Sequence, residues 1–248
     1  MTLLFERVYG APPATTRYVR GSLPLLDGLD VPLPWGAAVA AARSGDGTTS
    51  LFSMNHHDHG VVTPSTAAAW ADDCLKAVDA NPAPGTNLLV NRELPAEMGL
   101  LTGAETTEAT TRALRDVHDA VPATRPAPRR SCSLSGAGLR VLLIEVGSRH
   151  PPAVPPADPE TPARVRAALL AGRPADLGPI LIDAHAPGNP AHDDALEAAL
   201  DAGALGGRTI GTCVAALAPE SAVPAIRARV TARLAPSLHR PPRYLIAG

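Results

Sequence analysis

Residues Leu139–Val146 read LRVLLIEV, a run of leucine and β-branched residues interrupted only by Arg140 and Glu145. A run this short and this apolar is typical of a strand that is buried on both faces of a sheet. Thr209–Ala218 (TIGTCVAALA) and Arg243–Ile246 (RYLI) have the same character. We therefore expect three strands here that lie in one sheet.

Between and after these strands, apolar residues recur at intervals of three and four, which indicates amphipathic helices. In the first of them Val165 and Leu169 form the inward face, and Gly172 is a typical helix stop. The expected helices cover Thr161–Ala171, Leu177–Ala184, Ala191–Ala202 and residues 223–234. Strands and helices in this order indicate an α+β sandwich, with helices on one face of a mainly antiparallel sheet.

The N-terminal half is expected to open with strands. Ala37–Arg43 and Thr48–Met54 flank a Ser-Gly-Asp-Gly sequence at residues 44–47, which is typical of a hairpin turn. The elements expected after this hairpin are a helix, a buried strand and a threonine-rich helix: Ser65–Ala80, Thr86–Asn91 and Glu105–Asp119.

A proline- and arginine-rich stretch, VPATRPAPRRSCS, occupies residues 121–133 and shows no periodicity. Such a composition is typical of an exposed linker. With 248 residues the chain is long enough for two small domains. We therefore expect an N-terminal domain at residues 1–130 and a C-terminal domain at residues 131–248.

The composition excludes several classes of protein. A net charge of −2 with 19% charged residues argues against a nucleic-acid-binding surface. Glu6 and Arg7 interrupt the apolar run that a signal peptide would need, and no apolar stretch is long enough to span a membrane. The cysteines, Cys74, Cys132 and Cys213, match no metal or redox spacing. We expect a cytoplasmic protein with reduced thiols and with neither a nucleic-acid nor a membrane partner.

Three stretches carry a resemblance to a known superfamily. The first is DGLDVPLP followed by AVAA (residues 27–41), and the second runs from residue 70 through LLVNRELP to residue 101. The third begins with GALGGRT at residue 203 and continues through VAALAP to the terminal PPRYLIAG. Together they resemble galactokinase and the galacto-, homoserine, mevalonate and phosphomevalonate (GHMP) kinases. The resemblance implies an α+β fold of two lobes, with antiparallel or mixed sheets covered by helices and with an interlobe cleft.

The phosphate loop of these kinases is altered in this chain. A phosphoryl-transfer site needs backbone N–H groups and hydroxyls around the phosphates and a ligand for Mg²⁺. The matching residues 95–105 read PAEMGLLTGAE, in which Met98 replaces a glycine and Leu101 and Gly103 replace serines. Glu97 places a carboxylate where an anion should bind. The residues still suited to a phosphate are Gly99 and Thr102.

Two other parts of the kinase machinery lack a counterpart. The Glu-His-Thr-Asp signature of the sugar site is replaced by Gly21-Ser22-Leu23-Pro24, and the short linker at residues 121–133 leaves no room for the segment that carries the catalytic aspartate. Arg17 corresponds to the active-site arginine of the superfamily. The resemblance therefore implies that the fold is kept and the kinase chemistry is lost. No cofactor is expected. ATP with Mg²⁺ would be expected only if the chain is a residual kinase.

The resemblance places several polar residues beside the cleft. The candidate catalytic residues are Arg17, Glu93, Glu105 and His150. The candidate substrate-binding residues are Arg20, Gly99, Thr102 and His185. With Met98 and Leu101 on its wall, and carboxylates from Glu97 and Glu105, such a cleft favours a neutral or cationic, partly apolar small molecule.

The sequence NHHDH at residues 55–59 is the other candidate site. Three imidazoles and a carboxylate could bind a metal ion or shuttle protons. On a strand, however, His57 and His59 would lie on one side and His56 on the other. We expect a solvent-facing turn and no metal site, with His57 and His59 as outside candidates for a metal.

These observations predict a galactokinase-like scaffold that has lost phosphotransfer from ATP. We expect it to serve a specialised biosynthetic pathway as a small-molecule-binding protein or as a non-kinase enzyme. Two alternatives stay open. One is a residual kinase that phosphorylates a sugar or another small molecule, and the other is a pseudokinase that regulates or binds a partner.

Overall fold

The computed structural model describes residues 1–81, 84–94, 98–118, 134–147 and 158–248. They form two compact units. The N-terminal unit contains the described residues of Met1–Gly21, Pro34–Ala96 and Leu101–Pro128, and the C-terminal unit those of Ser22–Leu33, Glu97–Leu100 and Arg129–Gly248. The chain therefore passes between the units more than once. The domain boundary expected at residue 130 lies outside the described residues and stays a prediction.

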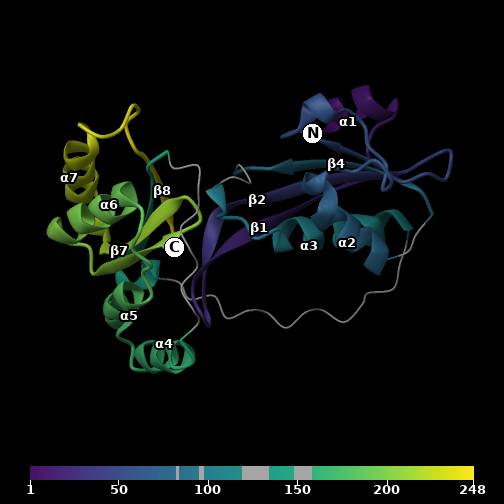
Figure 1. Ribbon diagram of the computed structural model, residues 1–248. Helices are drawn as coiled ribbons and strands as arrows, with labels where there is room; N and C mark the ends of the chain where they lie inside the picture. The colour runs from purple at the N-terminus through teal and green to yellow at the C-terminus, as the bar shows by residue number, and fades with distance from the viewer. Residues whose placement is uncertain (82–83, 95–97, 119–133, 148–157) are drawn as a thin grey trace. The chain divides into compact units, whose positions relative to one another are not determined.

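The N-terminal unit is built on a four-stranded sheet (Figure 1). Its elements are α1 (Thr2–Tyr9), β1 (Thr15–Leu26), β2 (Leu29–Arg43), β3 (Ser50–Ser53), α2 (Asp72–Ala80), β4 (Thr86–Arg92) and α3 (Ala104–His118). The strand order is β1-β2-β4-β3. The far ends of β1 and β2, at residues 22–33, belong to the C-terminal unit.

Alternating side chains on β2 and β4 cover both faces of this sheet. Val39 lies opposite Val90, and both pack in the cluster that includes α2 and α3. Ala40 lies opposite Leu89, and both pack against Phe5 of α1. Because successive residues of a strand point to opposite faces, one pair of strands holds helices on both sides, as Figure 1 shows. The N-terminal sheet therefore has helices on both faces, whereas helices on one face were expected for the C-terminal sheet.

The hairpin expected around residues 44–47 is also wrong. Strand β4 lies between β2 and β3, antiparallel to β2 and parallel to β3. The turn contacts the start of β4 instead, since the Ser44 amide donates to the Gly85 carbonyl at 3.0 Å. Leu88 and Leu89 are fully buried, so the more apolar strand takes the interior place in the sheet.

The C-terminal unit has a second four-stranded sheet, in the order β6-β7-β5-β8 with antiparallel neighbours. Its elements are β5 (Leu139–Glu145), α4 (Thr161–Leu170), α5 (Leu177–Asp183), α6 (Pro190–Asp201), β6 (Gly206–Ile210), β7 (Cys213–Pro219), α7 (Val223–Leu234) and β8 (Arg243–Ala247). The expected sheet is confirmed. Residues 209–218, however, are not one strand, because the chain reverses at Gly211, whose φ is +57°.

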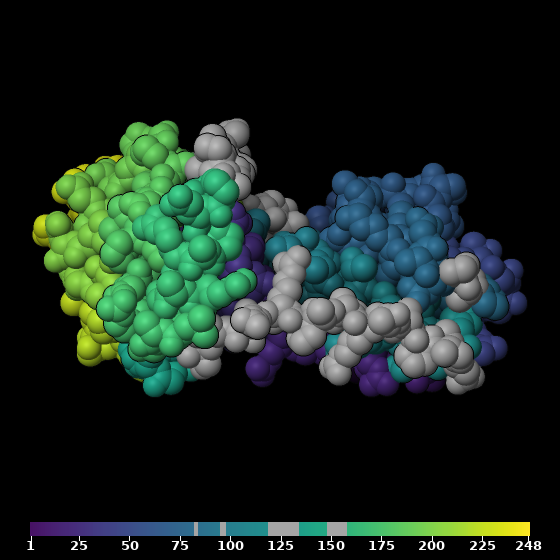
Figure 2. Space-filling view, turned by 90° about the horizontal axis from the view of Figure 1, so that it is seen from below, coloured from purple at the N-terminus to yellow at the C-terminus, as the bar shows by residue number. Residues whose placement is uncertain are grey.

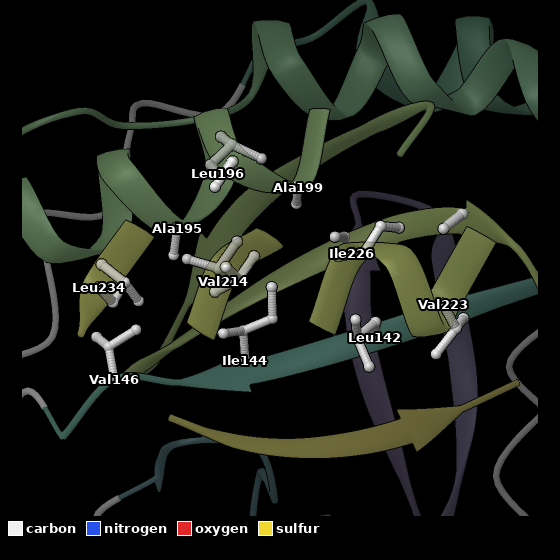
Figure 3. Close-up of a cluster of buried hydrophobic side chains, with 14 residues drawn as sticks. Leu142, Ile144, Val146, Ala195, Leu196, Ala199, Val214, Val223, Ile226 and Leu234 are labelled. Atoms are coloured by element: carbon white, nitrogen blue, oxygen red, sulfur yellow. The ribbon is translucent and has the colours of Figure 1, made fainter. Parts of the chain in front are cut away.

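Helices α6 and α7 cover one face of this sheet (Figure 3). Ile144 and Val214 point into the cluster that they form with Ala195, Ile226 and their neighbours. Helix α5 contacts β6 at an edge of the sheet, and α4 and α5 form part of the green surface in Figure 2. The apolar side chains thus anchor α6 and α7 on the sheet, and burial of this kind is the main stabilising term of such a fold.

Two further expectations need correction. Helix α1 stands where only strands were expected, and its amphipathic pattern buries Phe5 alone. The helix expected over residues 65–80 begins at Asp72, after a 3₁₀ turn at Ala69–Ala71. Within the residues that the structure places, no helix is long and apolar enough to cross a bilayer.

Candidate functional site

The start of α3 holds a buried carboxylate. Glu105, in the first turn of the helix, is 4% exposed. Its Oε1 accepts a hydrogen bond from the Gly103 amide at 3.2 Å and lies 3.5 Å from Nη2 of Arg92. The same Nη2 donates to the Leu101 carbonyl at 3.1 Å. The side chain of the chain's own glutamate therefore occupies the anion position at this helix N-terminus.

A second carboxylate lies beside the same loop. A Cβ on Gly103 would overlap the carboxylate of Asp73, so the backbone packs tightly against that side chain. Asp73 is held by an ion pair with Lys76 at 3.0 Å, and its carbonyl accepts from the Thr107 hydroxyl at 3.0 Å. Thr102, which is exposed, accepts a long hydrogen bond of 3.4 Å from the amide of residue 104.

The earlier part of the phosphate loop belongs to the C-terminal unit. There the Met98 carbonyl accepts a hydrogen bond from the Thr212 amide at 3.1 Å, in the turn between β6 and β7. Gly99 adopts a φ of +64°, and a Cβ on it would lie 3.0 Å from Cα of Gly211. This turn lies between GALGGRT and VAALAP, within the third stretch that carries the kinase resemblance. The Thr212 amide of this turn is already hydrogen-bonded to the chain's own backbone. Glu97 lies outside the described residues.

Arg17 is paired on the surface of the N-terminal unit. Its guanidinium forms an ion pair with Asp116 of α3, which also accepts from the Thr15 hydroxyl at 2.9 Å. The hydrogen bond from Arg17 lowers the pKa of the Asp116 carboxyl. About half of the Arg17 side chain is exposed, so this pair contributes little to stability.

Glu93 binds two donors near the end of β4. Its Oε2 accepts from the Tyr18 hydroxyl at 2.6 Å and from the Gly36 amide at 2.7 Å. Partial burial and the Glu93 carboxylate raise the pKa of Tyr18 to about 12, while the charge of the exposed Arg20 acts in the opposite direction. Among the described contacts, no hydrogen bond or ion pair joins Glu93 to Arg17 or Glu105.

His185 is part of a network that the sequence did not reveal. Its Nε2 lies 3.1 Å from Oδ1 of Asp193, and its Nδ1 lies 3.4 Å from both the amide and the hydroxyl of Thr209. The Gly188 amide donates to the other oxygen of Asp193 at 3.1 Å. Asp193 follows His185 by eight residues and sits in the first turn of α6. The pair links α6 to β6 and can hold or move a proton.

The neighbouring His192 is almost fully buried. Its Nε2 lies 3.1 Å from the Thr212 carbonyl, while its buried Nδ1 has no hydrogen-bond partner in the described part of the chain. Burial lowers the pKa of His192, with His185 acting in the same direction and Asp193 in the opposite one. The imidazole therefore supports the β6–β7 turn in its neutral form.

The lowered pKa of His192 predicts that the stability of the fold depends on pH. A histidine with a depressed folded pKa stabilises the fold above its unfolded pKa of about 6.5, and the contribution is lost as the pH falls. His192→Gln keeps a donor for the Thr212 carbonyl but does not titrate. We expect the Tm of the natural chain to fall more than that of His192→Gln between about pH 7.5 and pH 5 in thermal unfolding. Parallel falls in the two proteins would contradict this.

The NHHDH segment is a turn with a structural role. Asn55 donates to the Arg92 carbonyl and accepts from the Arg92 amide, both at 2.8 Å, so its side chain continues the pairing with β4 beyond the end of β3. His56 stacks on Trp70 with ring centroids 6.1 Å apart. Residues 57–59 form an exposed 3₁₀ turn, so the solvent-facing turn expected here is confirmed, while the alternation of a strand does not apply to His57 and His59. The described residues contain no group of three potential ligands placed to hold a metal ion.

The candidate residues thus fall into separate local clusters within their units. Thr102 and Glu105 lie together at the start of α3, Gly99 lies against the β6–β7 turn, and His150 is outside the described residues. Sequence reasoning missed the pairing of Arg92 with Glu105 and the other partners that define these clusters: Asp73, Asp193, Thr209 and His192. Only Asp193 carried a signal, since an asparagine cap followed by proline and a carboxylate marks a helix start.

Comparison with known proteins identifies the fold. No family profile and no curated protein sequence matches the chain. Among solved structures it is similar to Lactococcus lactis galactokinase complexed with galactose, with a TM-score of 0.70 and 15% identity over 99% of this chain and 96% of that one. It is also similar to homoserine kinase from Cytophaga hutchinsonii (TM-score 0.65, 15% identity, 94% of each chain). Methanococcus jannaschii mevalonate kinase matches with a TM-score of 0.61 and 12% identity over 94% of this chain and 97% of that one. The chain therefore has the fold of the GHMP kinases, as the sequence resemblance implied.

Proposed function

We propose that this chain uses the GHMP kinase fold to bind a small molecule and does not transfer phosphate from ATP. It would act in a specialised pathway, as a binding protein or as an enzyme with other chemistry. The observation that carries the proposal is the buried Glu105 carboxylate, which accepts from the Gly103 amide beside Arg92.

The charges at the start of α3 disfavour a bound phosphate. A helix N-terminus attracts an anion because its first amides are unpaired and its dipole is positive there. At the start of α3 the Gly103 amide already donates to the Glu105 carboxylate. The Asp73 carboxylate adds a second negative charge next to Gly103. A phosphate placed here would lie beside two carboxylates in a partly buried position, where like charges repel strongly.

The β6–β7 turn supports the same conclusion. A glycine-rich loop binds phosphate through free backbone N–H groups. Here two residues, Gly211 and Thr212, separate the strands, and the Thr212 amide donates to the Met98 carbonyl. The turn thus offers few donors to a nucleotide. The His185–Asp193 pair, by contrast, supplies a proton-transfer group within the same unit, which favours a non-kinase enzyme over an inert scaffold.

Thermal unfolding with Mg-ATP tests the proposal. A chain that binds ATP gains stability as the logarithm of its concentration, about 2.7 kcal/mol at a hundredfold excess over Kd. We expect no such rise in Tm for the natural chain, with a galactokinase as the positive control, and no turnover with hexoses. A rise that grows with ATP concentration would instead support the residual kinase.

A matched pair of variants tests the role of Glu105. Glu105→Ala removes the internal carboxylate and leaves Arg92 and the Gly103 amide free for an anion, so millimolar phosphate should raise the Tm of this variant. Glu108→Ala, on the same helix, removes a carboxylate that pairs with Arg112 at 2.8 Å. It should show no phosphate dependence. Equal responses of the two variants would count against the assignment.

A further inference from the structure

The C-terminal unit contains a hollow of about 580 Å³ at the end of β5. It is lined by residues 145–147, by the segment 237–241 that follows α7, and by Arg243 at the start of β8. This volume is typical of pockets that bind small molecules. The kinase resemblance assigned no role to any of these residues.

The walls of the hollow are held by the fold. Glu145 and Arg243 are direct neighbours in the antiparallel pair of β5 and β8. On the other side, the amides of Ser237 and Leu238 both donate to the Leu234 carbonyl at 3.0 Å, and Leu238 packs on the core under α7. Two prolines then lead into β8, and a proline's φ is restricted by its ring. The hollow is therefore part of the folded unit.

Its lining combines positive charge with an apolar wall. Arg240 and His239 have no hydrogen-bond or ion-pair partner among the residues that the structure describes. Nε of Arg243 lies 3.9 Å from Oε2 of Glu145, beyond hydrogen-bond distance, and the other oxygen of Glu145 accepts from the Gly147 amide at 2.9 Å. Two arginines and one glutamate leave one net positive charge when the imidazole is neutral.

We propose that this hollow binds a small molecule that carries a single carboxylate and a short apolar chain. The free guanidinium of Arg240 offers a planar pair of donors that matches a carboxylate. Val146, Leu238 and Pro241 supply the apolar wall. A dianionic phosphate suits the site less well, because the Glu145 carboxylate lies on the same wall. The proposal uses none of the residues on which the proposed function depends.

Titration of the ¹⁵N-labelled full chain with sodium hexanoate tests it. We expect saturable shifts of the amide signals of residues 237–240 and Arg243, and weaker binding of inorganic phosphate. Hexanol, which has the same apolar chain without the charge, should bind at least tenfold more weakly. Equal binding of hexanol and hexanoate, or shifts confined to other parts of the chain, would overturn the proposal.

Variants identify the anchor. Arg240→Ala should weaken hexanoate binding at least tenfold, and Arg240→Lys should recover only part of the loss because the ammonium group lacks the planar fork. Arg240 is exposed, so both variants should fold. The control is Arg229→Ala, which removes an exposed arginine of α7 that pairs with Asp201 at 3.2 Å. It should bind like the natural chain. Unchanged affinity in Arg240→Ala would show that the anchor is wrongly assigned.

Discussion

Gly211→Ala should destabilise the C-terminal unit by about 3 kcal/mol or more. Two costs add at this position. A side chain at a φ of +57° is strained by about 1–2 kcal/mol. The new Cβ would also overlap the Met98 carbonyl oxygen and lie 3.0 Å from Cα of Gly99, and these backbone atoms cannot rotate away. Overpacking of this kind adds about 1–3 kcal/mol. Urea unfolding, followed by circular dichroism, measures the change.

Gly138→Ala is the matched control for this variant. Gly138 also has a positive φ, +67°, but a Cβ on it would meet nothing within 4 Å. It should therefore lose only the conformational part, about 1–2 kcal/mol. The difference between the two variants measures how tightly residues 98–99 pack against the β6–β7 turn. Equal losses would show that this close approach does not exist in solution.

Ile144→Ala should cost about 4 kcal/mol. Ile144 is fully buried near the C-terminal end of β5, where it packs on α6 and α7 (Figure 3). Truncation removes buried apolar atoms and leaves a cavity, which together cost about 2–5 kcal/mol in well-packed cores. Strand neighbours on both sides prevent the sheet from collapsing into the space.

Ile246→Ala makes the same chemical change on the edge strand β8. Ile246 is 42% exposed, so the loss should stay near or below about 1 kcal/mol. Both variants are compared by urea unfolding under identical conditions. A loss for Ile144→Ala no larger than that for Ile246→Ala would mean that the sheet does not have the core described above.

For Glu105, the sequence and the tertiary structure identify different features. The sequence alone named Glu105 as a candidate catalytic residue and, together with Glu97, as a carboxylate that makes the site unfavourable to phosphate. It did not identify Arg92 as the partner, which precedes it by 13 residues on another element. That pairing depends on how β4 and α3 pack, and packing distances are not encoded in the local spacing of residues.

The sequence determined the elements whose signal is local. Strand β5 and helices α3, α6 and α7 begin within one residue of their expected positions, because apolar spacing and caps depend only on near neighbours. The GHMP kinase fold was also recognisable from the order of motifs. Only the tertiary structure decided that β4 lies between β2 and β3, that residues 22–33 join the C-terminal unit, and that His185 pairs with Asp193. Each of these features depends on contacts between residues that are distant in the chain. Burial and geometry set the free energy of such contacts, and they produce no periodic pattern in the sequence.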